Sequence, residues 1–165
     1  MIKYILSFIG LATAQILIFN QIQFSGYINP SFYLLFVLLL PINSPAWIRL
    51  LSAFLLGFTI DIFSQSPGIH SSATVFIAFI QPYLVMAFKN TDIDESKPCS
   101  LSRLGFKWFI SYSMFMILIH HSIYFILEVF SFNQLADTLF RIVISSFATF
   151  TAILLAQLVI YKKHQ

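Results

Sequence analysis

Residues 54–82 read FLLGFTIDIFSQSPGIHSSATVFIAFIQP, and this stretch decides the fold class. Two apolar runs are joined by a short polar turn that holds Pro67 and Gly68, with Asp61 before it and His70 after it. A bare charge in hydrocarbon costs several kcal/mol, so an acid and an imidazole here must lie at the edge of a membrane or inside a buried site. The stretch predicts a hairpin of two membrane helices.

The composition of the whole chain predicts an integral membrane protein. Of its 165 residues, 59% are hydrophobic, only 9% are charged and 20 are phenylalanine, and the mean hydropathy is +0.88. Soluble domains carry about 25% charged residues, and so apolar a surface would not stay in solution. We therefore expect a single transmembrane domain over residues 1–165, with no room for a separate soluble catalytic domain.

Long uncharged stretches indicate the number of crossings. A bilayer core about 30 Å thick takes about 20 helical residues per crossing, and these stretches are too long for barrel strands of about 10 residues. The sequence predicts an all-α, six-helix transmembrane bundle with spans at about 2–20, 32–42, 46–63, 69–88, 106–128 and 137–161.

Two of these spans have alternative interpretations. The first could be a signal peptide, because residues 12–14 imitate a cleavage site, but the cut would follow an unusually short segment, so we keep it as a span. The second is short and ends at Pro41, so it either crosses fully or re-enters the membrane packed against protein.

The basic residues predict an orientation. On a six-span path that starts inside, one cation, Arg141, falls on the outer side, and the others fall on the inner side: Lys3, Arg49, Lys89, Lys97, Arg103, Lys107, Lys162 and Lys163. The positive-inside rule then places both termini and the loop 89–105 in the cytoplasm. We expect Trp47 and Arg49 to be interfacial anchors and the single Cys99 to be an ordinary reduced thiol.

Polar residues inside the spans predict hydrogen-bonded packing between helices. Gln15 and Asn20 lie in the first span, and His120 and His121 lie near the middle of the fifth. Neighbouring helical residues differ by about 100° in direction, so the two histidines do not face one site; a proton path is their alternative role. No metal-ligand spacing accompanies them, and we expect no metal or cofactor.

The Asp61 corner has three possible roles. Gly57 lies one helical turn before Asp61 and would let another helix approach closely, which indicates a packed structural hairpin or a partner-binding corner. A hydrolase is the less favoured alternative, since serines surround the acid and the imidazole. Phosphate loops, nucleophile elbows and zinc motifs do not occur in the sequence. We expect no catalytic residue, and lipid rather than nucleic acid at the basic loop.

The hairpin resembles that of the MreD family, the rod shape-determining membrane proteins of bacteria. In GFTIDIFSQSPGIHSSATVF, Gly57, Asp61, Gly68, His70 and Ala73 match the family's Gly-x-x-x-Asp and Gly-x-His-x-x-Ala pattern. The polar residues of the first span, the turn GYINP and the following FYLLFVLLLP support the match. The proline-bounded second span and the phrase FIAFIQP resemble the Bacteroidetes branch, although Gln81 stands where an arginine is common.

The resemblance implies a non-enzymatic scaffold of the cell-elongation complex in the bacterial cytoplasmic (inner) membrane. It implies MreC, through its membrane helix or periplasmic stem, as the direct partner. MreB and the glycosyltransferase and transpeptidase that build peptidoglycan would be indirect partners. It also implies a fold similar to the substrate-binding subunits of energy-coupling-factor transporters. The alternative function is therefore a small-molecule or lipid-binding membrane transport subunit, and an intramembrane enzyme is third.

Overall fold

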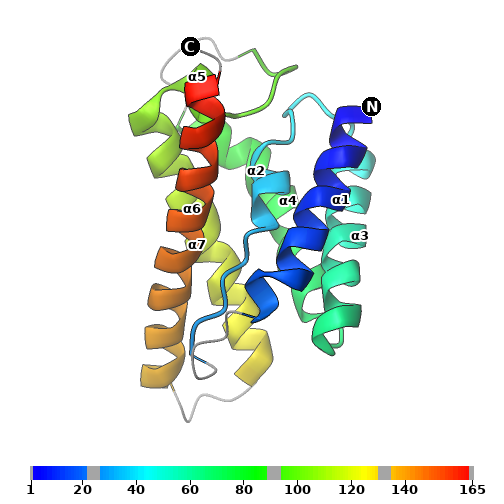
Figure 1. The fold of residues 1–165 in the computed structure, drawn as a ribbon, viewed down its shortest axis with the longest axis vertical. Helices are drawn as coiled ribbons and strands as arrows, with labels where there is room; N and C mark the ends of the chain where they lie inside the picture. The colour runs from blue at the N-terminus through cyan, green and yellow to red at the C-terminus, as the bar shows by residue number, and fades with distance from the viewer. Residues whose placement is uncertain (1, 22–26, 89–93, 130–134, 164–165) are drawn as a thin grey trace.

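The computed structural model describes residues 2–21, 27–88, 94–129 and 135–163 (Figure 1). Gly26 and Lys89 lie outside the described residues, as do the side chains of Lys162 and Lys163. The helices are α1 (Ile2–Leu17), the 3-10 turn η1 (Phe19–Gln21), α2 (Leu34–Leu38), α3 (Ala46–Ser64), α4 (Ile69–Ala87), α5 (Leu101–Leu104), α6 (Phe106–Val129) and α7 (Leu135–Lys163). The described residues contain no β-strand, and the expected all-α fold class is confirmed.

Within the described residues, five helices are long and apolar enough to span a membrane. They are Ile2–Gln21, Ala46–Ser64, Ile69–Ala87, Phe106–Val129 and Leu135–Tyr161. Their bounds lie within two residues of those expected from the sequence, because long uncharged runs end where polar turn residues begin.

The prediction of a sixth membrane helix over residues 32–42 is wrong. Only the five residues Leu34–Leu38 are α-helical, and all five are buried. Pro30 and Pro41 bound the segment. A proline cannot donate a backbone hydrogen bond, and it pushes the preceding residue away from the helical region. The helix α2 is therefore confined to little more than one turn.

The segment 27–45 nevertheless runs the length of the bundle (Figure 1). Near its start, the backbone N–H of Asn29 donates to Ser145 Oγ of α7 at 3.0 Å. Near its end, the backbone N–H of Asn43 donates to the carbonyl of Glu95 at 3.0 Å, at the opposite end of the bundle. The described chain thus passes along the bundle six times, five times as a long helix and once as an irregular segment. The start of α1 and the end of α7 lie at the same end (Figure 1).

Side chains of neighbouring helices provide hydrogen bonds for the carbonyl groups at the end of α2 and just after it. Gln81 Nε2 of α4 donates to the carbonyls of Val37 at 3.0 Å and Leu40 at 2.8 Å. The hydroxyl of Tyr112, from α6, donates to the carbonyl of Leu38 at 3.2 Å. The last carbonyls of a helix have no intrahelical partner, and hydrocarbon offers no water to replace one. These donors therefore allow the segment to lie inside the bundle.

Arg49 of α3 also serves the irregular segment, and its expected role as an interfacial anchor is wrong. Its side chain is buried, at 7% exposure. Nη1 donates to the carbonyls of Ile42 at 3.1 Å and Ser44 at 3.2 Å, and Nε donates to the carbonyl of Ala78 at 3.0 Å. Ala78 precedes Pro82 by four residues, so its carbonyl lacks the usual helical donor. One guanidinium thus compensates both for the turn and for the proline in α4.

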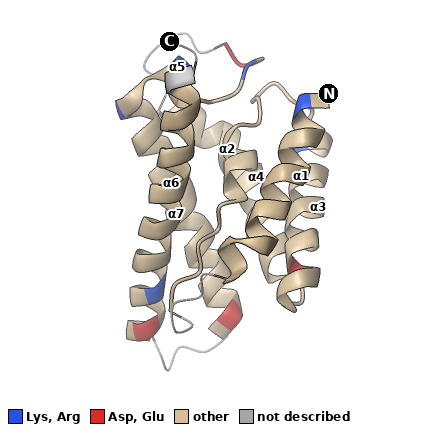
Figure 2. Cartoon of the chain, in the orientation of Figure 1, with Lys and Arg blue, Asp and Glu red and all other residues tan. Residues whose placement is uncertain are grey.

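Most basic side chains lie toward one end of the bundle, together with Asp94 and Glu95, and the other end is mainly acidic (Figure 2). Acidic groups mark the end of α3, the end of α6 and the start of α7, with one basic group of α7 beside them. These residues are Asp61, Glu128, Asp137 and Arg141. The other described basic groups lie toward the end that holds α5 and the start of α1. Without the pass of the irregular segment, Lys3 of α1 would lie at the opposite end from the basic residues that follow α4.

Replacing Gln81 tests the support of the irregular segment. We expect Gln81→Leu to lower the free energy of unfolding by about 1 to 3 kcal/mol, because the buried carbonyl of Leu40 loses its donor, whereas the carbonyl of Val37 keeps the backbone N–H of Leu40 at 3.1 Å. The measurement is reversible unfolding in detergent, followed by circular dichroism. The control is Gln21→Leu, since Gln21 is exposed; equal losses in the two variants would contradict the assignment.

Cysteine labelling in intact cells tests the crossing of α4 and the orientation of the bundle. Pro67→Cys and Lys97→Cys place exposed thiols at opposite ends of the bundle. We expect a membrane-impermeant maleimide to label position 67, and to reach position 97 only after the cells are opened. The native thiol does not interfere, because Cys99 is buried and burial raises its pKa to about 11. Labelling of both positions from the same side would refute the crossing of α4.

Candidate functional site

The carboxylate of Asp61 is the centre of the hairpin. Oδ1 accepts hydrogen bonds from the backbone N–H of His70 at 2.9 Å and from Ser66 Oγ at 2.8 Å. Oδ2 accepts from the backbone N–H of Ser71 at 2.9 Å and from the hydroxyl of the same residue. His70 Nδ1 lies 3.1 Å from Oδ1. The side chain of Asp61 is only 5% exposed, so these partners replace water around the charge.

Asp61 acts as the cap of α4, although it belongs to α3. The first N–H groups of a helix have no intrahelical partner and are usually bonded by the side chain of the residue before the helix. That residue is Gly68, which has no side chain to offer. Asp61 accepts from the second and third residues of α4 instead, and its negative charge lies at the positive end of the helix dipole. The carboxylate therefore joins the end of α3 to the start of α4.

The turn between the two helices requires two left-handed residues. Gln65 ends α3 with φ 54°, and its N–H donates to the carbonyl of Asp61. Gly68 precedes α4 with φ 79°, a conformation that glycine adopts without steric penalty. The chain reverses within these few residues, which brings His70 back over Asp61.

Gly57 sets the spacing of α3 and α4. A Cβ atom at this position would lie 2.6 Å from Ser71 Cα and 2.8 Å from the carbonyl oxygen of His70, closer than such atoms can approach. The two backbones therefore touch at Gly57, and Asp61, one turn further along α3, reaches the start of α4. Ala73 is fully buried on the other side of α4, where it packs against α6 and α7. Small side chains at both positions permit this close packing.

The burial of the motif residues favours the structural alternative over partner contact. Gly57, Asp61 and Ala73 are enclosed between helices, so a partner could reach them only if the hairpin opened. The exposed residues of the turn itself are Gln65 and Pro67. A partner contact at this end of the bundle would therefore use the turn and not the motif itself.

The acid, imidazole and hydroxyl of the hairpin do not form a catalytic relay. Ser66 Oγ lies 2.8 Å from His70 Nδ1, and Asp61 Oδ1 lies 3.1 Å from the same nitrogen. In a serine hydrolase triad, the serine and the acid contact opposite ring nitrogens. Here both contacts fall on one atom, so no base is directed at the hydroxyl. The geometry is that of a hydrogen-bonded cluster around a buried carboxylate.

Gln15 and Asn20 connect the first helix to the irregular segment and to the hairpin. Gln15 Nε2 donates to the carbonyl of Pro30 and to Asn20 Oδ1, both at 2.8 Å, and its Oε1 accepts from the backbone N–H of Tyr33 at 3.3 Å. Asn20 Nδ2 donates to Ser64 Oγ at 2.9 Å. Gln15 thus bonds both a backbone carbonyl and a backbone N–H group just before α2.

His121 holds the start of the irregular segment from the side of α6. Its Nε2 lies 3.2 Å from the carbonyl oxygen of Asn29 and 3.3 Å from Thr149 Oγ1, and its Nδ1 lies 3.0 Å from the carbonyl oxygen of Ile117. Thr149 of α7 also accepts the backbone N–H of Ser31 at 2.9 Å. Helices α6 and α7 therefore both bond the segment, and the threonine was not found from the sequence.

His120 faces a different neighbour. Its Nε2 lies 3.0 Å from the hydroxyl oxygen of Tyr33, whereas its Nδ1 is buried and has no hydrogen-bond partner among the described residues. The rings of His120 and His121 lie at 77° to each other, with centroids 5.2 Å apart. In the described part of the chain, no group of three His, Cys, Asp or Glu side chains could hold a metal ion.

The spacing of Asp137 and Arg141, one helical turn apart in the sequence, predicts an ion pair within the helix, but Arg141 pairs with Glu128 instead. Its Nη2 lies 2.8 Å from Glu128 Oε2, and its guanidinium lies 4.6 Å from the ring centre of Phe125. Helices α6 and α7 pack side by side here, so a residue across the interface is a better partner than one on the same helix. Asp137 stays exposed in the first turn of α7, where the helix dipole favours an acid.

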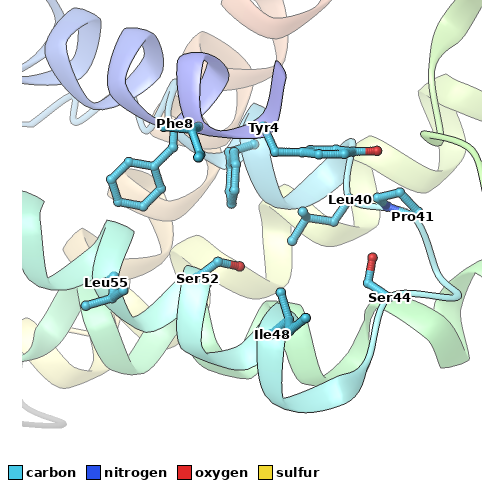
Figure 3. Close-up of a pocket in the computed structure, with 10 residues that line it drawn as sticks. Tyr4, Phe8, Leu40, Pro41, Ser44, Ile48, Ser52 and Leu55 are labelled. Carbon is cyan, nitrogen blue, oxygen red and sulfur yellow. The ribbon is translucent and has the colours of Figure 1, made fainter. Parts of the chain in front are cut away.

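Two hollows of opposite character lie at different places in the bundle. We call the first the polar pocket; it has a volume of about 420 Å³ and is lined by Asn20, Ile28, Asn29, Ser64, Gln65, Ser66, Pro67, Ile69, His70, Tyr124, Glu128 and Arg141. We call the second the apolar groove; it also has a volume of about 420 Å³ and is lined by Tyr4, Ile5, Phe8, Phe36, Leu40, Pro41, Ser44, Ile48, Ser52 and Leu55 (Figure 3).

The sequence contains a pattern that indicates the apolar groove. Ile48, Ser52 and Leu55 recur at helical spacing on α3, and Tyr4 and Phe8 recur on α1, so a small residue faces a row of large ones. Figure 3 shows these side chains pointing into the space between the two helices.

No family model, no curated protein and no solved structure matches this chain. The resemblance to transporter subunits therefore stays an expectation. Chemically, the bundle offers an apolar surface for a helix at one place and a hydrogen-bonding cavity at another.

A pair of glycine variants tests the contact between α3 and α4. We expect Gly57→Ala to lower the free energy of unfolding by about 1 to 3 kcal/mol, because the new methyl group collides with the backbone of α4. Gly10→Ala is the control, since a Cβ there meets no atom within 4 Å and alanine favours the helix by up to about 1 kcal/mol. Unfolding in detergent measures both; a neutral Gly57→Ala variant would refute the close approach.

Proposed function

We propose that this protein is a non-enzymatic membrane scaffold that holds the transmembrane helix of a partner against its apolar groove. The resemblance of the hairpin to MreD suggests MreC as that partner. MreB and the glycosyltransferase and transpeptidase of peptidoglycan synthesis would then be reached through MreC. The observation that supports this proposal best is the apolar groove itself.

The groove has the chemistry of a helix-binding surface. Its lining is almost entirely aliphatic and aromatic, while Ser44 and Ser52 keep two positions small. Ser52 Oγ donates to the carbonyl of Arg49 at 3.0 Å, so its hydroxyl is satisfied within α3. Helices in membranes associate by close packing at small residues, because apolar burial gives no advantage over lipid. A partner helix would gain such packing along α3.

Helix α1 leaves room for a partner beside it. It packs against α3 and α2, and only two of its residues, Ala12 and Gln15, are buried. Ile5 and Ile9 are 54% and 55% exposed. In a membrane these faces would meet lipid or another helix, and a helix in the groove would cover the side of α1 that includes Ile5.

The orientation of the bundle suggests how such a scaffold would work. The groove lies toward the start of α1 (Figure 3), at the end of the bundle that carries most of the described basic residues. We assign that end to the cytoplasm by the positive-inside rule. A partner helix held there would keep an outer enzyme complex in register with a filament inside the cell.

A specific observation favours the alternative of a small-molecule-binding subunit. The polar pocket lies at the opposite end of the bundle, and its volume falls in the range of ligand sites. It does not overlap the apolar groove, since the two share no lining residue.

Filling the groove tests the scaffold proposal. We expect Leu55→Trp to reduce co-purification of MreC from native membranes by about tenfold, as overpacking costs about 1 to 3 kcal/mol. Leu158→Trp is the matched control, because Leu158 is exposed on α7, outside the groove. Both variants should insert and unfold like the unchanged protein. Equal recovery of MreC with the two variants would exclude the groove as its binding site.

A further inference from the structure

The polar pocket lies where five parts of the bundle meet. The hairpin turn contributes residues 64–70, the irregular segment contributes Ile28 and Asn29, η1 contributes Asn20, and α6 and α7 contribute Tyr124, Glu128 and Arg141. In membrane proteins, irregular backbone at this depth occurs where it is buried in protein or lines a cavity. Ile28 and Asn29 belong to such a segment and line this cavity, an observation independent of the cavity's size.

The charges around the polar pocket cancel. Glu128 and Arg141 pair with each other at 2.8 Å. Asp61 lies behind His70, and its two oxygens already accept hydrogen bonds from the backbone and side chains of the α4 start. An anionic ligand at the guanidinium would lie beside the carboxylate of Glu128, and a cationic ligand at that carboxylate would lie beside the guanidinium of Arg141. The pocket therefore favours a molecule without net charge.

Hydrogen bonds to neighbouring residues hold the polar groups of the pocket in place. Asn29 Nδ2 donates to the hydroxyl of Tyr124 at 2.9 Å, and Asn20 Nδ2 donates to Ser64 Oγ at 2.9 Å. His70 is fixed through Nδ1. A pre-organised site loses less entropy on binding than a mobile one. Groups of this kind suit a ligand whose own groups both donate and accept.

The walls of the pocket are not uniformly polar. Ile28, Pro67 and Ile69 contribute apolar surface beside the amides and hydroxyls. A sugar ring has this same combination, with hydroxyl groups around its edge and carbon-bound hydrogens on its faces. The geometry points to a site for a small uncharged molecule rich in hydroxyl and amide groups, the chemistry of a sugar. A scaffold and a transport subunit could both contain such a site. The inference therefore does not depend on the proposed function.

Three sugars of one ring size and different charge test this inference. The probes are N-acetylglucosamine, which is neutral, glucosamine, which is cationic, and glucuronate, which is anionic. Calorimetric titration into the full-length protein in detergent should show saturable binding of the neutral sugar, and affinities at least about tenfold lower for the two charged sugars, a difference of about 1.4 kcal/mol. Equal or tighter binding of a charged sugar, or no saturable binding of any, overturns the assignment.

A matched pair of variants places the binding in the pocket. Ile28→Trp fills the cavity, whereas Ile62→Trp makes the same change at an exposed position of α3. We expect Ile28→Trp to lose at least about tenfold in affinity for N-acetylglucosamine and Ile62→Trp to keep it. Unchanged affinity in Ile28→Trp would show that the sugar binds elsewhere, and the proposal would fail.

A labelling experiment covers the case in which Ile28→Trp does not fold. Pro67→Cys introduces a thiol into the pocket lining at an exposed residue. We expect N-acetylglucosamine to slow its maleimide labelling in a saturable manner, and glucuronate not to do so. Lys97→Cys, at the opposite end of the bundle, should label at the same rate with and without the sugar. Protection of neither site, or of both, overturns the proposal.

Discussion

The structure depends on one constraint: the irregular segment 27–45 passes through the bundle where no water can bond its backbone. Five helices contribute side chains to this task, namely Gln15 from α1, Arg49 from α3, Gln81 from α4, Tyr112 and His121 from α6, and Ser145 and Thr149 from α7. An unpaired backbone group in hydrocarbon costs several kcal/mol. Polar side chains that look anomalous in apolar helices are therefore explained by the segment they surround.

The hairpin solves the same problem at a helix end. The start of α4 exposes N–H groups that Gly68 cannot bond, and Asp61 of the preceding helix accepts them. This arrangement is possible only because Gly57 lets the two backbones touch. An aspartate near a histidine resembles a catalytic pair in the sequence. In the structure, both carboxylate oxygens of Asp61 instead accept hydrogen bonds from the first turn of α4. The residue pattern and the fold are thus consequences of the same contact.

The sequence predicted the long helices well and the second pass poorly, for a physical reason. Hydropathy and charge identify where a chain can lie in a membrane, and these fixed the bounds of α3, α4 and α6 closely. Hydropathy and charge do not reveal that most of a buried segment such as 32–42 can be non-helical when side chains of other helices bond its carbonyls. Those side chains come from distant positions, so the role of Gln81, 41 residues from Leu40, appears only in three dimensions. The partner of Arg141 was missed for the same reason, since Glu128 lies on another helix.

The separation of the two hollows follows from the path of the irregular segment. Its start, at Ile28 and Asn29, lines the polar pocket, and its end, at Leu40 and Pro41, lines the apolar groove. A regular helix in this place would bond its own backbone and would not need the glutamine, tyrosine and histidine groups that surround it. The segment between the hollows is buried and bonded throughout α2, so it connects them through rigid structure. A molecule in one hollow and a helix in the other would therefore touch the same stretch of chain at its two ends.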